Sequence, residues 1–501
     1  MTTDYQKLLE NVNEVHDLEK ALMVLSWDKE TNMPPKGITA RIHQMTTLQR
    51  LTYKMSTSDE MGELIENAAN ELNGTAYGSN EASLIRYLQR SYGNAKKLTT
   101  DYVTRSAEVS GKAREAWVKA RQDNDFSAFQ PHLEQVVALC QELAELYGYE
   151  DEAYDALLDK YETDAKTADV RAIFDAVKAE LVPLRQAIEE RGTAVSDAIL
   201  HQPYDIATQK EFARYAAEAV GYDFERGHLG TVVHPFATNF SRDDARITTR
   251  WYPDFISPSL FGTLHESGHA MYEQGTHADL YRTPLARGTS LGIHESQSRM
   301  MENIVGRSLG FWQRHFPKLQ ALFPDQLGGA SVNDFYRAIN KTQASYIRVE
   351  ADELTYNFHI ILRFELEQAM LNGDLAVKDL PTAWHDKMES LIGVAPPNDT
   401  LGCLQDPHWT RPGFGYFPTY ALGNLYAAQF YETAVSQNPT IAEEMGDGKT
   451  EALVAWLVEN IHQHGRKFTP SELVQNVTGS PLSHEAFMRY ATEKFSAIYG
   501  L

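Results

Sequence analysis

The sequence predicts a mainly α-helical fold with one small β-sheet, and three observations lead to this prediction. Apolar residues recur at three- and four-residue spacing over most of the 501 residues, as they do on the buried face of a helix. One stretch, residues 227–251, is instead rich in Val, Ile, Thr and aromatic residues, which favour strands. No repeat, low-complexity tract or long linker divides the chain, so we expect residues 1–501 to form one unit with two lobes around a groove.

Three long helices are predicted from apolar spacing. The first covers residues 5–22 and the second residues 133–146. The third begins after Ser331 and runs to Asn372 and Gly373, where the glycine is a credible C-cap. Its apolar stripe consists of Ile347, Ala351, Leu354, Phe358 and Ile361.

The β segment reads as a hairpin or a three-stranded sheet. "TVVHPFATNF" and "ARITTRWY" are the strand-like runs, and "SRDD" separates them as a turn. Residues 401–420, "LGCLQDPHWTRPGFGYFPTY", are dense in Gly, Pro and aromatic residues, which predicts an ordered loop.

Composition excludes several classes of partner. The formal net charge is -23, with 69 acidic residues against 46 Lys and Arg, and such a surface repels nucleic acids and anionic membranes. No stretch approaches the ~20 apolar residues of a membrane span, and the polar N-terminus shows no signal peptide. The two cysteines, Cys140 and Cys403, form no CxxC pattern, so we expect a protein of the reducing cytoplasm.

A candidate metal site stands at residues 265–269, which read His-Glu-Ser-Gly-His. Ser257 and Pro258 form a good helix start, as N-cap and first helical residue, and Gly275 is a good stop. The two histidines then lie one turn apart on one helical face. That is the spacing which two imidazoles need to reach one Zn²⁺ at about 2.0–2.1 Å.

Glu266 can face the attacking water from the same helix, as the general base that takes its proton and later returns it to the leaving amine. A catalytic zinc usually has three protein ligands and one open position, so a third ligand must come from elsewhere in the chain. A third histidine is excluded, because Gly275 occupies the position that the HExxHxxGxxH pattern needs and His277 is off that spacing.

A glutamate remains as the third ligand, and three are near in sequence. Glu295 lies 26 residues beyond His269, in "GIHESQSRMMENIVG", which looks helical. Glu273 lies on the same predicted helix as the two histidines and points along its axis, which makes it a poor third metal ligand. Glu302 could serve as a ligand or belong to a solvated face. Spacing alone leaves Glu295 and Glu302 open.

Six short motifs follow one another along the chain: "HPF" at His234, "DARIT" at Asp244, "HESGH" at His265, "HESQ" at His294, "IRVEADE" at Ile347 and "GCLQDPHW" at Gly402. A further N-terminal run, "SWDKETNMPPKG", begins at Ser26. With these motifs in this order the chain resembles the carboxypeptidase Taq family of metallocarboxypeptidases, and the resemblance covers most of the chain.

The resemblance implies a nearly all-helical, neurolysin-like fold around a long deep groove. It implies a homodimer that removes single residues from peptide C-termini with broad specificity. It also assigns the third ligand to Glu295. We therefore expect one Zn²⁺ per chain, although Co²⁺ can occupy the same nitrogen and oxygen ligands.

The reaction needs a donor for the tetrahedral oxyanion besides the metal. His234, in the β segment, and Tyr420, in the Gly-rich loop, are the first candidates, and His408 is the third. Each could equally be an interior side chain that a backbone group satisfies.

An exopeptidase must also bind the terminal carboxylate of its substrate, and arginine does this best through two parallel donors. Arg348 is the first choice, with Asp352 one turn on to orient it, although such a pair is often only a surface ion pair. Arg411 and Arg246 are alternatives, but Arg246 and Asp244 are better explained as bracing the sheet.

Two other functions remain open from sequence. An endo-acting oligopeptidase could use the same fold and metal, and would release internal fragments. A non-catalytic peptide-binding protein would hold its metal in a closed site with four protein ligands, and Glu266 would then have no role.

Overall fold

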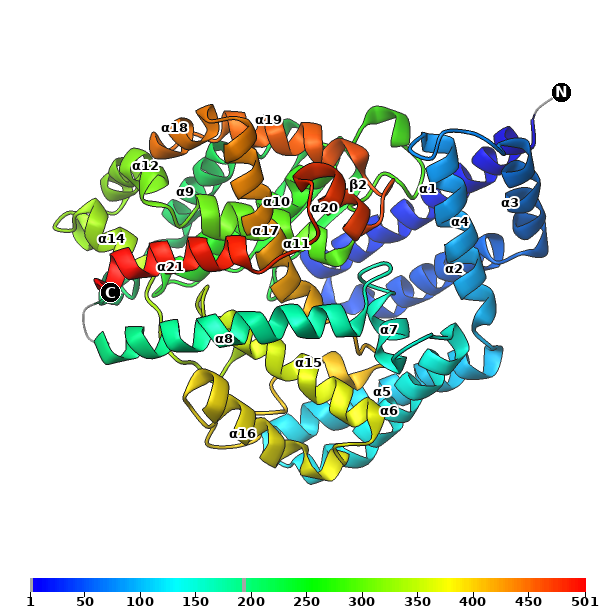
Figure 1. Ribbon diagram of the computed structural model, residues 1–501, viewed down its shortest axis with the longest axis horizontal. Helices are drawn as coiled ribbons and strands as arrows, with labels where there is room; N and C mark the ends of the chain where they lie inside the picture. The colour runs from blue at the N-terminus through cyan, green and yellow to red at the C-terminus, as the bar shows by residue number, and fades with distance from the viewer. Residues whose placement is uncertain (1–2, 192–194) are drawn as a thin grey trace. The chain divides into compact units, whose positions relative to one another are not determined.

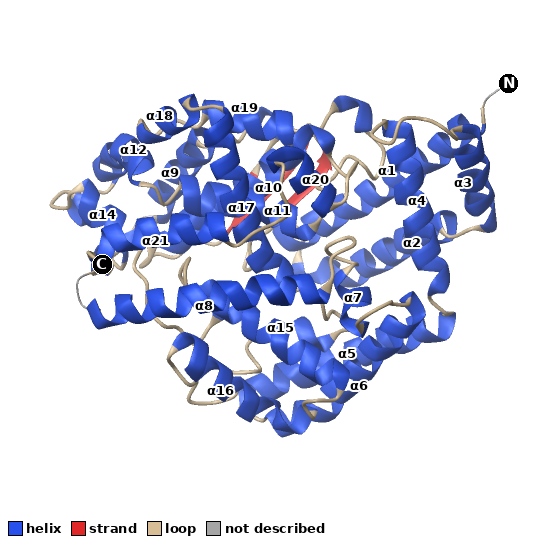
Figure 2. Cartoon of the chain, viewed as in Figure 1, coloured by secondary structure: helices blue, strands red, loops and turns tan. Residues whose placement is uncertain are grey.

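The computed structural model describes residues 3–191 and 195–501, and helices dominate it (Figures 1 and 2). The chain divides into two compact units, each built from three segments that are distant in sequence. Because the chain passes repeatedly from one unit to the other, no single linker marks a boundary. The first unit contains Met1–Lys96, Asp197–Ile339 and Phe430–Ser480, and the second contains Lys97–Ser196, Asn340–Gln429 and Pro481–Leu501.

The first unit begins with a bundle of four helices. α1 starts at a capping box, in which the Thr3 hydroxyl accepts from the Gln6 backbone N–H and the Gln6 side chain accepts from the Thr3 N–H. Leu8, Val12 and Val15 are buried against apolar residues of α3 and α4, which confirms the predicted first stripe. The bundle consists of α1 (Asp4–Thr31), α2 (Ile38–Ser56), α3 (Asp59–Glu71) and α4 (Asn80–Lys97).

Helix α10 (Ile256–Gln274) is the centre of the first unit and is buried along most of its length. It packs against the sheet, α9 and α11. The remaining helices of this unit are α9 (Ile206–Ala219), α11 (Leu291–Arg299), α12 (Leu309–Leu322), α13 (Pro324–Leu327), α14 (Val332–Ile339), α18 (Thr440–Gly446), α19 (Glu451–Asn460) and α20 (Pro470–Thr478).

The predicted sheet is present and has three strands. β3 (Asp244–Thr249) lies in the middle, parallel to β1 (Leu229–Thr231) and antiparallel to β2 (Ala237–Ser241). The turn between β2 and β3 falls within the predicted "SRDD". Among the described residues no other sheet forms, so the mainly α class with one small sheet is confirmed.

The second unit is helical. Its α6 contains the predicted helix 133–146, whose apolar residues are buried. In the described part of the chain, no helix is both long enough and apolar enough to span a membrane. The helices of this unit are α5 (Thr100–Asp123), α6 (Phe126–Tyr147), α7 (Ala153–Leu158), α8 (Thr167–Arg191), α15 (Tyr356–Asn372), α16 (Leu380–Ile392) and α21 (Glu485–Tyr499), and α17 (Pro418–Gln437) begins in it.

The long helix predicted between Ser331 and Gly373 is wrong in its middle. α14 ends at Ile339, and residues 340–355 form a loop with a single 3₁₀ turn, η6 (Arg348–Glu350), before α15 begins. Asp352 explains the break, because its carboxylate accepts from the backbone N–H groups of Leu354 and Thr355 and so holds a turn. The C-cap at Gly373 is confirmed, in the left-handed conformation with φ of 81°.

The predicted start of the metal-site helix is also wrong, by two residues. α10 begins at Ile256 with Phe255 as N-cap, and Ser257 makes no capping hydrogen bond. Pro258 therefore stands at the third helical position, where a missing N–H still costs nothing because the first turn has no partner for it. The stop at Gly275 is confirmed.

Candidate functional site

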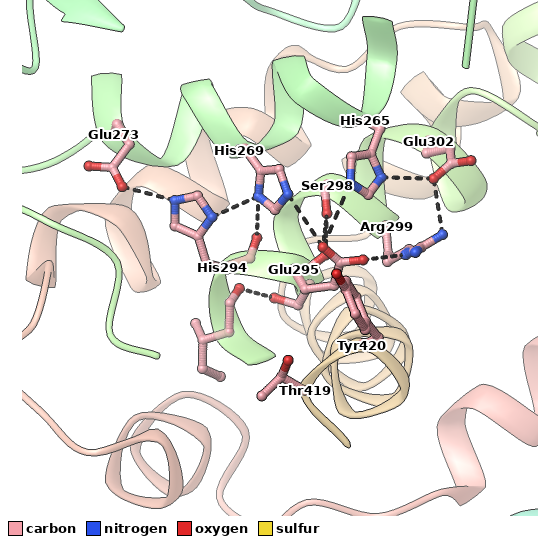
Figure 3. A network of polar contacts seen from close by, with 12 residues as sticks. His265, His269, Glu273, His294, Glu295, Ser298, Arg299, Glu302, Thr419 and Tyr420 are labelled. Atoms are coloured by element: carbon pink, nitrogen blue, oxygen red, sulfur yellow. Dashed lines mark hydrogen bonds and ion pairs between the residues drawn. The ribbon is translucent and has the colours of Figure 1, made fainter. Parts of the chain in front are cut away.

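Helix α10 carries the HESGH run and presents both of its histidines on one side (Figure 3). The ring centroids of His265 and His269 are 4.9 Å apart, and their planes are nearly perpendicular at 87°. This is the arrangement that the spacing of four residues predicts, with two imidazoles free to approach one ion from different directions.

Gly268 allows α11 to come close enough to complete the cluster. A Cβ atom at this position would collide with the carbonyl oxygen of Gln297, so a larger residue would push the two helices apart. Glu295 lies on α11, and its Oε2 atom is 3.7 Å from His265 Nε2 and 3.3 Å from His269 Nε2. The helix itself begins where the Ser290 hydroxyl accepts from a backbone N–H.

These three side chains fit a metal ion. Their ligand atoms all lie within 4.8 Å of one another, and no other such group occurs in residues 3–191 and 195–501. Two imidazole nitrogens and one carboxylate oxygen suit Zn²⁺ and leave a fourth tetrahedral position open. The three-residue cluster therefore differs from a closed structural site.

Glu302 supports His265 from outside the cluster. Its Oε2 atom is 2.9 Å from His265 Nδ1, so this carboxylate accepts from the ring nitrogen that faces away from Glu295 (Figure 3). Arg299 bridges the two glutamates, with Nε 2.7 Å from Glu295 Oε1 and Nη1 3.2 Å from Glu302 Oε2. Glu302 lies in a π-helical segment, Met300–Val305, that continues α11.

The solvated-face interpretation of Glu302 is therefore wrong, since its side chain is only 15% exposed and fully engaged. Burial opposes ionisation of both glutamates, but Arg299, His265 and further neighbouring groups together outweigh it, which lowers the pKa of Glu302 to about 2 and that of Glu295 well below its ordinary range. Burial alone would lower the pKa of His265, yet Glu295 and Glu302 raise it. Hydrogen-bonded outer carboxylates of this kind orient a ligand and strengthen metal binding.

His269 is oriented by His294 instead of by a carboxylate. Its Nδ1 atom is 3.0 Å from the His294 carbonyl oxygen and 2.7 Å from His294 Nδ1, and the two rings stack at 4.5 Å. The other nitrogen of His294 is 2.8 Å from Glu273 Oε1. Glu273 thus stays out of the cluster, as its place on α10 predicted. Burial and His294 lower the pKa of His269 to about 4, which keeps the imidazole neutral.

Glu266 is buried beside the cluster, with 7% of its surface exposed. In the described part of the chain, no group donates a hydrogen bond to its carboxylate. Burial, and then the negative charges of Glu295 and Glu302, raise its pKa to about 7. A carboxyl group with that pKa can accept and return a proton near neutral pH.

The family model of the carboxypeptidase Taq (M32) metallopeptidases matches residues 7–495. The chain belongs to this family. The helical fold with its small sheet is that of the M32 metallocarboxypeptidases, and the family match confirms the carboxypeptidase interpretation over the endopeptidase and the non-catalytic alternatives.

Relatives of this M32 carboxypeptidase share its whole length. It is 40% identical to thermostable carboxypeptidase 1 of Thermus thermophilus, with 99% of each chain covered, and 35% identical to carboxypeptidase 1 of Bacillus subtilis, with 96% and 95% covered. Its structure matches that of the M32 carboxypeptidase from Deinococcus radiodurans with a TM-score of 0.96 at 36% identity, covering 99% and 100%.

Arg348 belongs to a second polar cluster, in the second unit of the M32 enzyme. It is 6% exposed, and its Nη2 atom donates to Asp406 Oδ1 at 2.9 Å while Nη1 donates to the Tyr356 hydroxyl at 2.9 Å. Arg363, fully buried on α15, donates to the other oxygen of the same aspartate at 2.6 Å. Two guanidinium groups thus share one carboxylate, and the cluster keeps a net positive charge.

The predicted partner of Arg348 is wrong. Asp352 holds the turn before α15, whereas Asp406 orients Arg348. The 3₁₀ turn at Arg348 removes the helical spacing on which the pairing with Asp352 depended. Asp406 stands in the quoted "GCLQDPHW" motif and could have been singled out there, but Arg363 gave no signal beyond its place on an apolar helix.

His408 and Tyr420 lie in the same second cluster. The His408 Nδ1 atom is 3.6 Å from Asp406 Oδ1, and its ring packs on Phe417. The Tyr420 ring is 5.2 Å from the Arg348 guanidinium, and its hydroxyl is 3.4 Å from that of Tyr416. Burial lowers the pKa of His408 and raises that of Tyr420, so both side chains are neutral at pH 7.

The other predicted site residues are exposed or structural. His234 is exposed on the loop between β1 and β2, and Arg411 is exposed after η8 (His408–Thr410). Arg246 forms a two-pronged ion pair with Asp244 at 2.7 and 2.8 Å and covers the ring of Phe240. That contact joins β3 to β2, as expected of a brace for the sheet.

Proposed function

We propose that this M32 metallocarboxypeptidase binds one zinc ion through His265, His269 and Glu295 and cleaves the last peptide bond of its substrates there. The convergence of three ligand atoms beside the buried Glu266 is the observation that supports this most. A bound zinc ion supplies a Lewis acid for the scissile carbonyl and lowers the pKa of the attacking water from about 15.7 towards 7. Co²⁺ suits the same donors.

Glu266 moves the proton in this scheme. Its carboxylate takes a proton from the attacking water and delivers it to the amine that leaves, because burial brings the pKa of this carboxyl group closer to neutrality and so lets it hold the proton between the two transfers. The proposed ligands are held in place by three positioning residues, Arg299, Glu302 and His294.

Arg348 is proposed to bind the terminal carboxylate of the substrate. The guanidinium of Arg348 has five N–H donors. Asp406 accepts from Nε and from one N–H of Nη2, and the Tyr356 hydroxyl accepts from one N–H of Nη1. One N–H remains on each terminal nitrogen, which is the pair that a carboxylate accepts bidentately. Arg411, which is exposed after η8, remains a second candidate for binding this carboxylate.

Tyr420, His234 and His408 remain the proposed donors for the oxyanion, in that they carry an O–H or N–H and come from the family's motifs or their neighbourhood. Tyr420→Phe, His234→Ala and His408→Ala separate them. The donor is the residue whose loss lowers kcat and leaves KM unchanged, because a transition-state contact acts on kcat. Equal kcat in all three variants would leave the metal as the only oxyanion partner.

Metal content tests the ligand set. The protein should lose activity with a chelator and regain it with Zn²⁺ or Co²⁺, and mass analysis of an N-blocked peptide should show loss of single C-terminal residues. Glu295→Ala should fall well below one metal per chain, since it loses a direct ligand. Glu302→Gln keeps all three ligands and should weaken metal affinity by roughly 10- to 100-fold. Full occupancy in Glu295→Ala would contradict its assignment.

Helix α2 supports the proposed homodimer. None of its residues is buried, although a helix in a globular protein owes most of its stability to a packed face. Its apolar residues are exposed: Ile42 at 52%, Tyr53 at 54%, and Ile38 and Leu51 somewhat less. A surface with several exposed apolar residues on one helix is typical of a protein–protein contact.

If α2 forms the dimer contact, Ile42→Glu should shift the protein from dimer to monomer, because a charge would then be buried without a partner. Light scattering after gel filtration measures this. Val118→Glu on α5 is the matched control, since Val118 is 40% exposed and the other exposed large apolar residue described on that helix, Val103, lies 15 residues away. A dimer that survives Ile42→Glu, or a wild-type monomer, would refute the contact.

We also propose that residues 1–501 act as one catalytic domain in the cytoplasm. Both cysteines, Cys140 and Cys403, are buried and free, which suits a reducing compartment.

A further inference from the structure

A cavity of about 120 Å³ lies in the first unit, within the α1–α4 bundle. None of its lining residues belongs to the metal cluster. Its floor is apolar and formed by buried side chains of α1 and α3, among them Val12, Met61 and Ile65. Because a single buried water needs roughly 10–15 Å³ of cavity volume, this cavity has room for roughly eight to twelve groups of the size of a water molecule. That is the size range of one apolar amino acid.

His16 gives the cavity an unsatisfied polar group. It is 5% exposed, it lines the cavity, and its Nδ1 atom makes no hydrogen bond. Buried polar atoms are nearly always paired, so an orphaned one at a cavity wall indicates a missing partner. Burial, and then Lys20 and Arg287, lower the pKa of His16 to about 4, which leaves its imidazole neutral and able to donate from Nδ1.

Arg287 and Glu19 provide opposite charges beside the same cavity. Both line it and both are partly exposed, at 31% and 39% of the side chain, and they touch only loosely, at 3.5 Å. The Arg287 Nη2 atom makes that contact, and no described group accepts from its Nε or Nη1. A guanidinium with free donors next to a loosely held carboxylate is the counterpart of a zwitterion.

From these observations we infer that the α1–α4 cavity binds a single free apolar amino acid. Its carboxylate accepts from Arg287 and His16, its ammonium group donates to Glu19, and its side chain fills the apolar floor. The positive charge of Arg287 matters because the chain as a whole carries a charge of -23, against which an anion needs a local positive group. A carboxypeptidase releases this class of molecule, but the inference rests on the cavity alone.

Isothermal titration of L-leucine into the full-length protein tests this. Arg287→Gln should weaken binding by roughly 10- to 100-fold, as loss of a charged hydrogen bond does. Arg282→Gln is the matched control, because Arg282 lies in the same loop and pairs with Asp17 outside the cavity. It should bind leucine as the wild type does. Peptide hydrolysis should be unchanged in both variants, which separates this site from the catalytic one.

Two further comparisons complete the test. Ile65→Phe and Leu88→Phe each fill the cavity and should abolish leucine binding, with thermal unfolding to show that at least one is folded. 4-Methylpentanoate has the side chain and carboxylate of leucine but lacks the ammonium group. It should bind the wild type more weakly than leucine does, whereas Glu19→Gln should bind the two ligands with equal affinity. The inference is overturned if leucine does not bind, if Arg287→Gln and the filled variants bind it normally, or if both ligands bind the wild type equally.

Discussion

Replacing Glu266 by Gln should lower kcat/KM by at least ~10²-fold while metal content stays at the wild-type level. Glutamine keeps the shape of the side chain and cannot take a proton, and Glu266 is not one of the three proposed ligands. In the wild type, kcat/KM should rise with pH through an acid limb, because Glu266 acts as a base only when ionised. Its midpoint should lie below about 7, since a bound cation favours the carboxylate.

Metal analysis and a second variant give this experiment its control. Glu266→Asp retains a carboxylate at a shorter reach and should fall between the wild type and Glu266→Gln. Near-normal turnover by Glu266→Gln with full metal content would exclude Glu266 as the base. A loss of metal in that variant would show instead that Glu266 contributes to binding the ion.

Replacing Arg348 by Ala should lower kcat/KM by roughly 10- to 100-fold on peptides with a free C-terminal carboxylate, mainly through KM. Peptides with an amidated C-terminus should lose little, because they offer no charge to the guanidinium. Steady-state kinetics on matched acid and amide peptides measures the difference. The same loss on both would show that Arg348 supports the fold of its cluster and does not read the carboxylate.

Two variants control for charge and for stability. Arg246→Ala removes a guanidinium from an ion pair on the sheet and should change kcat/KM little. Arg348→Lys keeps the positive charge but loses the two parallel donors, so its kcat/KM should lie between those of Arg348→Ala and the wild type. Thermal unfolding of Arg348→Ala should be measured in parallel, to separate a loss of binding from a loss of the fold. We expect this variant to stay folded, because Asp406 keeps Arg363 as a hydrogen-bonded partner.

The local features of the metal site were predictable because they depend on neighbours in sequence. A spacing of four residues puts His265 and His269 on one helical face whatever surrounds the helix. The strand composition of residues 227–251 and the stop at Gly275 belong to the same category. The choice of Glu295 as third ligand was different, because only the resemblance favoured it over Glu302.

The segment between Ile339 and Tyr356 shows where local pattern fails. Its apolar spacing predicts helix, but Asp352 accepts from backbone N–H groups and Arg348 is held by Asp406, 58 residues away. Burial of a charged network that links distant parts of the chain outweighs helix propensity, which is worth less than ~1 kcal/mol per residue.

From the sequence alone came the helical class, the small sheet, and two of the proposed metal ligands with the proposed base between them, because each follows from composition, from periodicity or from spacing within one element. Tertiary structure decided how the ligands are held. Gly268 brings α11 against α10, and Glu302 and His294 orient the two histidines. It also replaced Asp352 by Asp406 as the partner of Arg348. Such contacts join residues far apart along the chain, and only packing brings them within hydrogen-bond distance.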